Sequence, residues 1–499
     1  MLFMIRQFRP NSIGTTAKIV SFFLVLFLSG VAALVNQVVW QRSLSVFMGG
    51  SESLSAMVVV LVFMLGLGSS SIWMGSRTSS LSDPLATLAT LELLLGVANL
   101  CIDRILQTGL SASVLDFQRL AQSSGAPLWT VYALGSLLLL TVPCMLMGAS
   151  VPVAAEVCQR GLRLRESRSV GLIFFSNTLG SVLGALSASG YWIPNFGLST
   201  TRVLFAAVSL GAGLMLVGLR VLLRDPPLSP SDTLPRSNVM SNATPSFHRV
   251  LAFGLGFCSL GYEMYLLRII GLRHEPLPFT FGAVVSGFLL YWSLGAAVSS
   301  SKWRLPYSPA LRVIALSSVV TASLSSFDPL SPITGLGSMI WLVVSRFPYF
   351  LPCFFYGWLF GELAAEGEKS WGKNVGRIYG SNMGGSCLGI VFMTLVGYEV
   401  PFFVMILFIA FTLYALNGYV RSRQNEPAGS VRTVFAWLNP LLAGVVPLVV
   451  FLVLDPLNRT GTTAQYSGRE GVLEIDAEQN LIWDGMWHSK LAENGDQVG

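Results

Sequence analysis

Residues 170–184 read VGLIFFSNTLGSVLG, and residues 375–389 read VGRIYGSNMGGSCLG. The two stretches agree at nine of fifteen positions, all at an offset of 205 residues. Each contains a Ser-Asn pair followed by glycines four residues apart. Chance is a poor explanation for a match of this length, so the sequence predicts that the chain consists of two repeated halves.

The repeat extends, more weakly, into other apolar segments of the chain. The first half contains Gly30, Gln37, Arg42, Pro143, Cys144 and Gly148, which recur in the second half as Gly256, Glu263, Arg268, Pro352, Cys353 and Gly357. Repeated halves of six helices each are the plan of major-facilitator-type transporters, in which the halves face one another across a central pathway. The paired glycines also predict close helix crossings, because small residues at four-residue spacing let two helix backbones approach in lipid.

The composition points to lipid as the solvent. Hydrophobic residues make up 53% of the 499 residues and charged residues only 11%, with a mean hydropathy of +0.65. A soluble protein of this size has about a quarter of its residues charged. The formal charge of +6 therefore indicates Lys and Arg held in loops on one side of a bilayer, and not a nucleic-acid partner.

Thirteen stretches are long and apolar enough to cross a bilayer, which takes about 20 residues. They are 17–40, 54–75, 84–103, 128–157, 169–190, 200–223, 249–272, 279–299, 308–326, 333–364, 375–397, 401–420 and 432–455. Pro143 and Pro352 are expected to kink the two longest, because proline removes a backbone hydrogen bond. The amphipathic stretch 104–127 predicts a short helix along the membrane surface.

The predicted fold is an all-α polytopic membrane protein with about 13 transmembrane helices in two repeated halves, plus a short C-terminal β-hairpin. The expected units are a first half at 1–224, a Pro- and Ser-rich linker at 225–247, a second half at 248–420, an extra helix within 421–455 and an extramembrane tail at 456–499. With the N-terminus inside, 21 Lys and Arg lie on the inner side and seven on the other. This asymmetry predicts a multi-pass protein of the inner (plasma) membrane with a cytoplasmic N-terminus. Thirteen spans place the tail outside, and one miscounted helix would reverse its side.

Several of these motifs together resemble the membrane half of fused major-facilitator/spermidine-synthase-like proteins. The resemblance covers roughly residues 20–455. It rests on SGVAALVNQVVWQR at 29–42, GGS at 49–51, FMLGLG at 63–68 and the two Ser-Asn helices. It implies a transporter-like membrane domain of unknown substrate, a cationic amine being one candidate.

The tail extends this resemblance. Residues 471–476 (GVLEID) and 481–488 (LIWDGMWH) alternate apolar and polar residues around a polar turn, which predicts a β-hairpin. It is similar to the hairpin that opens the spermidine-synthase-like domain of such fusions. In that family a Rossmann-like domain with a glycine-rich loop for decarboxylated S-adenosylmethionine follows. No such loop occurs after residue 456, and 44 residues are too few for the domain.

No catalytic, cofactor-binding or metal-binding residue is therefore carried over from the family, and no cofactor is expected. The three histidines lie far apart and the six cysteines form no CxxC pair. The resemblance leaves two alternatives to a transporter. One is a truncated or split membrane-anchored aminopropyltransferase, whose spermidine-synthase-like domain would be a separately encoded partner. The other is a membrane scaffold subunit that transports nothing.

The candidate functional residues are polar groups at membrane depth. Such groups are costly to bury, so a functional role is the first hypothesis for each of them. They are Glu92, Asn177, Glu263, Arg268 and Asn382. A carboxylate that faces a central cavity would attract a cationic amine or exchange a proton, whereas one paired with Arg268 or Arg346 would only orient helices. The two asparagine amides must hydrogen-bond either a neighbouring helix or a polar substrate.

Overall fold

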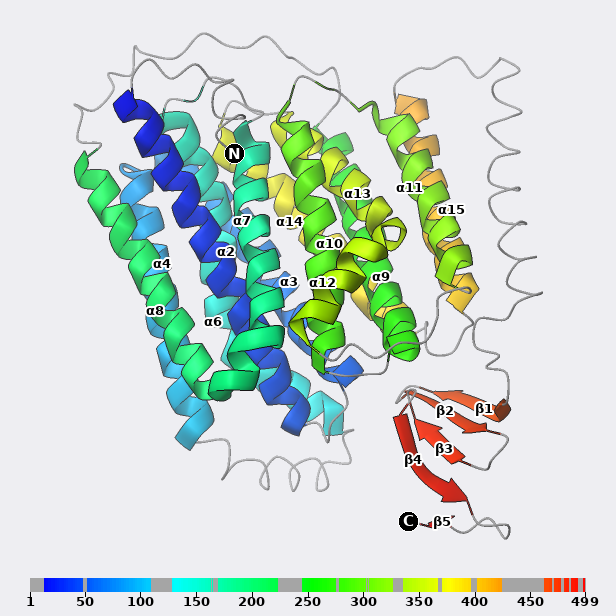
Figure 1. The fold of residues 1–499 in the computed structure, drawn as a ribbon. Coiled ribbons are helices and arrows are strands. Elements are labelled where there is room, and N and C mark those ends of the chain that lie inside the picture. The colour runs from blue at the N-terminus through cyan, green and yellow to red at the C-terminus, as the bar shows by residue number, and fades with distance from the viewer. Residues whose placement is uncertain are drawn as a thin grey trace.

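The computed structural model of the chain is a helix bundle with a separate small sheet (Figure 1). It describes residues 13–47, 52–108, 128–162, 164, 169–222, 245–274, 278–301, 303, 305–325, 335–366, 370–395 and 402–423, and five strand segments between 462 and 498. The helices of the first half are α2 (Ile13–Phe47), α3 (Glu52–Gly75), α4 (Pro84–Thr108), α6 (Leu128–Glu156), α7 (Ser169–Ser187) and α8 (Ile193–Leu222). Those of the second half are α9 (Pro245–His274), α10 (Pro278–Ser299), α11 (Tyr307–Ser325), α12 (Leu336–Ser345), α13 (Phe347–Ala365), α14 (Trp371–Leu395) and α15 (Phe402–Arg423).

The chain breaks at two notable places, one between the predicted spans 169–190 and 200–223 and one inside a predicted span. A helical path from α7 through the π-helical turn η3 (Ala188–Trp192) into α8 reverses at Gly197, whose φ of 73° lies outside the helical region. Glycine adopts this conformation without a steric penalty. The stretch predicted as one helix at 333–364 is two helices, α12 and α13, which meet at an angle of 72°. This bend lies at Arg346 and not at Pro352, because Pro348 occupies the first turn of a new helix, where proline is well tolerated.

The helix count supports a multi-pass membrane protein. In the described part of the chain, eight helices are long and apolar enough to cross a membrane, or nine if α12 and α13 form one span. The stretch Val170–Leu222 counts once although it contains both α7 and α8. The predicted thirteenth span at 432–455 lies outside the described residues, so thirteen helices are not confirmed. Of the predicted surface helix 104–127, residues up to Thr108 continue α4, and the rest is not described.

The tail contains a five-stranded antiparallel sheet in place of the predicted two-stranded hairpin. Its strands pair in chain order: β1 (Thr462–Gly468), β2 (Gly471–Asp476), β3 (Asn480–Trp483), β4 (Met486–Leu491) and β5 (Gln497–Val498). The stretch 481–488 contributes to both β3 and β4, because Trp483 pairs with Met486. The two residues between them are Asp-Gly, a dipeptide typical of tight hairpin turns.

The repeat in the sequence corresponds to a repeat of one type of helix crossing in the structure. A Cβ atom on Gly30 of α2 would lie 1.9 Å from the backbone oxygen of Asn177 on α7. A Cβ atom on Gly256 of α9 would lie at the same distance from the backbone oxygen of Asn382 on α14. The α2–α7 and α9–α14 crossings are therefore equivalent, and each requires glycine for its close approach.

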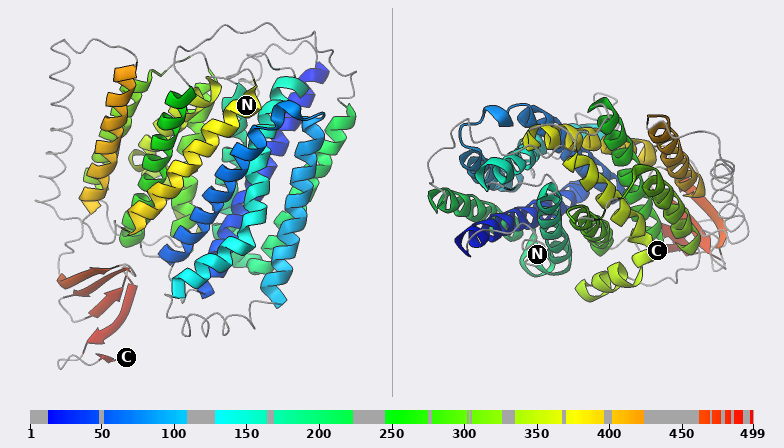
Figure 2. Two further views of the ribbon diagram at one scale, coloured as in Figure 1. Left: turned by 180° about the vertical axis from the view of Figure 1, so that it is seen from behind. Right: turned by 90° about the horizontal axis from the view of Figure 1, so that it is seen from above.

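Two further helix pairs join one half to the other. Helix α14 lies along α3 and α6, as the view from behind shows (Figure 2), and α7 lies along α10. At the end of α3, a Cβ on Gly75 would lie 2.8 Å from the Cα of Gly376 on α14. At the start of α7, a Cβ on Gly171 would lie 2.7 Å from the backbone oxygen of Ala296 on α10. Small residues thus bring the halves into direct backbone contact.

Candidate functional site

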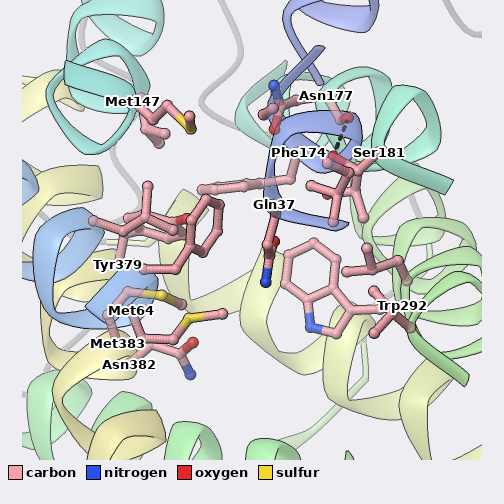
Figure 3. A pocket seen from close by; sticks show the side chains of 18 of the residues that line it. Gln37, Met64, Met147, Phe174, Asn177, Ser181, Trp292, Tyr379, Asn382 and Met383 are labelled. Carbon is pink, nitrogen blue, oxygen red and sulfur yellow. Dashed lines mark hydrogen bonds between the residues drawn. The ribbon is translucent and has the colours of Figure 1, made fainter. Parts of the chain in front are cut away.

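A cavity of about 150 Å³ lies between the two halves. Its lining residues come from α2, α3, α6 and α7 of the first half and from α9, α10 and α14 of the second. Such a position, between the helices of a bundle, is a common place for ligand sites. Figure 3 shows that Gln37 and the rings of Phe174 and Trp292 surround the same cavity, and that Met64 and Met383 lie on one side of it.

Aromatic rings from three distant segments form one wall of the cavity. The ring centroids of Phe174 and Trp292 lie 6.0 Å apart in an edge-to-face arrangement. Those of Phe174 and Tyr379 lie 5.8 Å apart. The three residues come from α7, α10 and α14, so the wall forms only when the two halves pack together. Aromatic faces of this kind attract cations and also bury apolar groups.

Three methionines add a flexible apolar surface. Met64, Met147 and Met383 line the cavity from α3, α6 and α14. An unbranched thioether side chain adapts its shape to different apolar partners. Sequence reasoning missed these residues, because a methionine in an apolar helix gives no signal that it faces a cavity.

Glu263 on α9 is the one acidic residue in the described lining of the cavity. Only 5% of its surface is exposed. It forms no hydrogen bond or ion pair within the described part of the chain. Gln37 of α2 lines the same cavity and is the residue that the internal repeat aligns with Glu263. The repeat was therefore the signal that could have identified Gln37 from the sequence.

The two candidate asparagines both line the cavity, and both also bind the neighbouring helix. The Asn177 Nδ2 donates to the backbone oxygen of Leu26 at 3.3 Å. The Asn382 Nδ2 donates to the backbone oxygen of Ala252 at 3.0 Å. Each amide thus donates one hydrogen to its helix crossing. Its second donor hydrogen and its acceptor oxygen are left for hydrogen bonds in the cavity.

The other two candidates lie away from the cavity. Glu92 on α4 is 2% exposed, and its Oε1 accepts a hydrogen bond of 2.7 Å from Ser29 of α2. Ser29 lines the cavity, whereas Glu92 lies behind it. Arg268 is half-buried on α9 and does not line the cavity. The structure therefore brings together Asn177, Glu263 and Asn382 and leaves these two outside.

A group of hydrogen bonds joins the two halves at the end of α6. The Glu156 Oε2 accepts from the Ser370 hydroxyl at 3.0 Å and from the Gly372 N–H at 3.3 Å. The Gln159 Oε1, in the π-helical turn η2 (Val157–Gly161), accepts from the Trp371 N–H at 2.8 Å. These acceptors satisfy backbone donors at the first turn of α14, where a carboxylate is also favoured by the helix dipole.

Comparison with known proteins finds similarity in structure alone. No protein-family profile matches the chain, and no curated protein matches it. A bacterial homologue of the iron transporter ferroportin, in an outward-facing state, superposes with a TM-score of 0.53 at 13% identity, covering 82% of this chain and 99% of that one. The nucleoside transporter NupG superposes with a TM-score of 0.50 at 11% identity, covering 81% of this chain and 99% of that one. The chain is therefore a multi-pass membrane protein that shares the overall fold of these two solved structures.

Proposed function

We propose that the protein transports a small organic cation with an apolar body through the cavity between its two halves. The observation that carries this proposal is the position of Glu263. Its carboxyl group is the single acidic group of the described lining and has no protein partner there. A buried carboxylate is costly unless it is paired, and a bound cation supplies the missing partner.

The remaining lining narrows the class of cation. The aromatic rings of Phe174, Trp292 and Tyr379 and the three methionines favour a substrate with apolar surface. A polyamine carries several charges, and the described lining offers one carboxylate. The cavity therefore fits an amine or quaternary ammonium with a single charge better than it fits a polyamine.

Binding of ethidium, an aromatic cation with one positive charge, tests the proposal. Purified protein in lipid nanodiscs should bind ethidium with an increase in its fluorescence, and Glu263→Gln should abolish this binding. The double variant Gln37→Glu/Glu263→Gln moves the carboxylate to the repeat-related position across the cavity. We expect it to recover part of the binding, because the charge of the cavity is restored.

The controls separate transport from the scaffold alternative. A scaffold subunit predicts no ethidium binding by the wild type and the same thermal stability in all three proteins. If Glu263→Gln binds as well as the wild type, the assigned role of Glu263 is wrong. Uptake of ethidium into proteoliposomes that contain trapped DNA then shows whether binding leads to transport.

We further propose an orientation and a partner. The excess of Lys and Arg on one side supports a cytoplasmic N-terminus in an inner (plasma) membrane, with halves at 1–224 and 248–420. The sheet of β1–β5 supports a distinct extramembrane unit in the tail. We assign to it the docking of a spermidine-synthase-like domain, the family to which the resemblance points. Co-purification of such a domain with the full chain, and its loss when residues 456–499 are removed, would support this assignment.

A further inference from the structure

A line of buried polar side chains follows one face of α2 and one face of α4. On α2 the residues are Ser29, Asn36, Trp40 and Ser43, and on α4 they are Glu92, Asn99 and Asp103. Their spacing of 7, 11 and 14 residues on α2, and of 7 and 11 residues on α4, keeps each set on one side of its helix. None is more than 7% exposed. We refer to these seven residues as the polar track.

Hydrogen bonds fix both ends of the polar track. At one end, the Ser29 hydroxyl donates to Glu92 at 2.7 Å. At the other end, Arg202 of α8 donates from Nε to the Asp103 carboxylate at 2.9 Å and from Nη1 to the Ser43 hydroxyl at 3.5 Å. The two helices therefore run in the same direction, and Asn36 and Asn99 lie between the two ends.

The polar track contains several polar atoms without partners. They are Asn36 Oδ1, Trp40 Nε1, Glu92 Oε2 and both polar atoms of Asn99, all buried and without a hydrogen bond in the described structure. Buried polar groups are nearly always satisfied, by protein or by ordered water. Glu92 and Asn99 are seven residues apart, which is about 10 Å along a helix. About three water molecules at hydrogen-bond spacing would span this distance and supply the missing partners.

We propose that Glu92 is a proton-binding site, loaded through this hydrated polar track and connected to the cavity by Ser29. The Ser29 Oγ lies 2.7 Å from Glu92 Oε1, and the charged carboxylate accepts the hydroxyl hydrogen there. The protonated carboxyl donates to the Ser29 oxygen instead, since a hydroxyl both donates and accepts. The Ser29 hydrogen then turns toward the cavity, which Ser29 lines. One proton enters from bulk water, is relayed along the chain and binds the Glu92 carboxylate, so each water of the chain ends neutral and no other group changes charge.

Around α4, the other acidic groups of the described residues form ion pairs, whereas Glu92 does not. Within the described residues, Asp83 at the start of α4 pairs with Arg220 of α8, and Asp103 pairs with Arg202 of α8. Glu156 at the end of α6 pairs with Arg160. Glu92 forms no ion pair there. A buried carboxyl without a counter-charge is favoured in its neutral, protonated form, so Glu92 is suited to hold a proton at membrane depth.

The polar track lies outside the cavity that contains Glu263, so proton binding and cation binding occupy separate sites. In its link to transport this proposal rests on the proposed function, and the proton site itself can be measured without any substrate. The two proposals therefore fail independently.

Infrared difference spectroscopy of the full chain in nanodiscs, between acid and alkaline pH, tests the proton site. A protonated carboxyl group gives a carbonyl stretching band that disappears on ionisation. We expect Glu92→Gln to lose one such band, which Glu263→Gln retains. Ethidium binding should show the reverse, with loss in Glu263→Gln and retention in Glu92→Gln. Persistence of every band in Glu92→Gln would overturn the proton site and leave the cation site standing.

A second pair of variants covers the case in which Glu92→Gln fails to fold. Ser29→Ala keeps the carboxyl and should shift its band to higher frequency, because the hydrogen bond to Ser29 is lost. Asn99→Leu should delay the shift of the same band after transfer to deuterated water, because an apolar side chain interrupts the water chain. An unchanged frequency in Ser29→Ala, or unchanged deuteration kinetics in Asn99→Leu, would contradict the assigned route.

Discussion

Two glycines show how strictly the helix crossings depend on single atoms. Gly30 and Gly256 lack the one carbon for which Asn177 and Asn382 leave no room. By contrast, Gly418 of α15 has no atom within 4 Å of the position that a Cβ would occupy. Since alanine favours helix over glycine, the same substitution has opposite consequences at the two kinds of site.

We expect Gly256→Ala to destabilise the protein by about 1–3 kcal/mol or more, because overpacking forces the α9 and α14 backbones apart. Gly418→Ala is the matched control and should leave the unfolding temperature unchanged or slightly raised. Thermal unfolding in detergent, followed by labelling of the buried cysteines, measures both. Equal unfolding temperatures for the two variants would show that the crossing tolerates a side chain.

Asp83 combines a helix cap with an ion pair. Its Oδ1 accepts from the Ala86 N–H at 2.9 Å, and its Oδ2 lies 2.5 Å from Arg220 Nε. Burial acts to raise the pKa of Asp83, but the hydrogen bonds from Ala86 and Arg220 outweigh it and hold the pKa below its ordinary value. A carboxyl whose pKa is lowered by folding contributes stability above its unfolded pKa of about 4, and this is lost as the pH falls through the folded value.

Asp83→Ala should therefore cost about 1 kcal/mol at neutral pH, mainly through the lost cap, because the ion pair is more than a third exposed and is screened. Asp83→Asn keeps an oxygen acceptor for the cap and should cost less, with no acid-dependent component at this position. Unfolding temperatures measured between pH 7 and pH 3 distinguish the two effects. A larger loss in Asp83→Asn than in Asp83→Ala would rule out the cap.

At the scale of elements, the first turn of α14 depends on α6. Removing the Glu156 carboxylate in Glu156→Ala leaves the Gly372 N–H and the Ser370 hydroxyl without their acceptor. We expect the backbone amides at the start of α14 to exchange with deuterium about five-fold faster, the equivalent of about 1 kcal/mol for a lost cap. Glu156→Gln retains an acceptor oxygen and should change the exchange much less. Unaltered exchange in both variants would mean that packing alone holds this turn.

The helices and the break near Gly197 were largely predictable from the sequence, and the bend at Arg346 was not. The predicted segment 54–75 corresponds to α3 at Glu52–Gly75, because an uncharged apolar run of membrane length permits few alternatives. The bend at Arg346 lies inside the predicted span 333–364, because the largely apolar sequence continues on both sides of it. The five-stranded sheet exceeded the predicted hairpin because short strands carry weak signals.

The candidate site was predicted only where the repeat or a charge marked it. Glu263 and the two asparagines stood out as polar groups in apolar helices, and all three line the cavity. Phe174 and Trp292 did not stand out, because an aromatic residue in an apolar helix has the same pattern whether it faces lipid or a cavity. Their meeting depends on contacts between segments more than a hundred residues apart.

At the scale of the whole molecule, the number of spans decides on which side of the membrane the sheet of β1–β5 lies. A span at 432–455 would place the sheet of β1–β5 on the outer side when the N-terminus is inside. We expect a cysteine introduced at Ser467 in β1 to react with a membrane-impermeant maleimide in intact cells, in a background without the six native cysteines. The matching variant at Ser80, between α3 and α4, should react only after the cells are permeabilised. Labelling of Ser467 only after permeabilisation would show that 432–455 does not cross the membrane.

The contact between α3 and α14 has a mechanical consequence. Within each half, the crossings interlock, since an asparagine and a serine of one helix hydrogen-bond the backbone of the other. Between the halves, Gly75 of α3 lies directly against Gly376 of α14, and one turn away the Ile72 side chain of α3 lies against Gly380 of α14. Helices resist sliding because the ridges of one lie in the grooves of the other, and glycines form no ridge. At Gly75 and Gly376 the contact between the halves therefore resists sliding less than the hydrogen-bonded crossings within each half do.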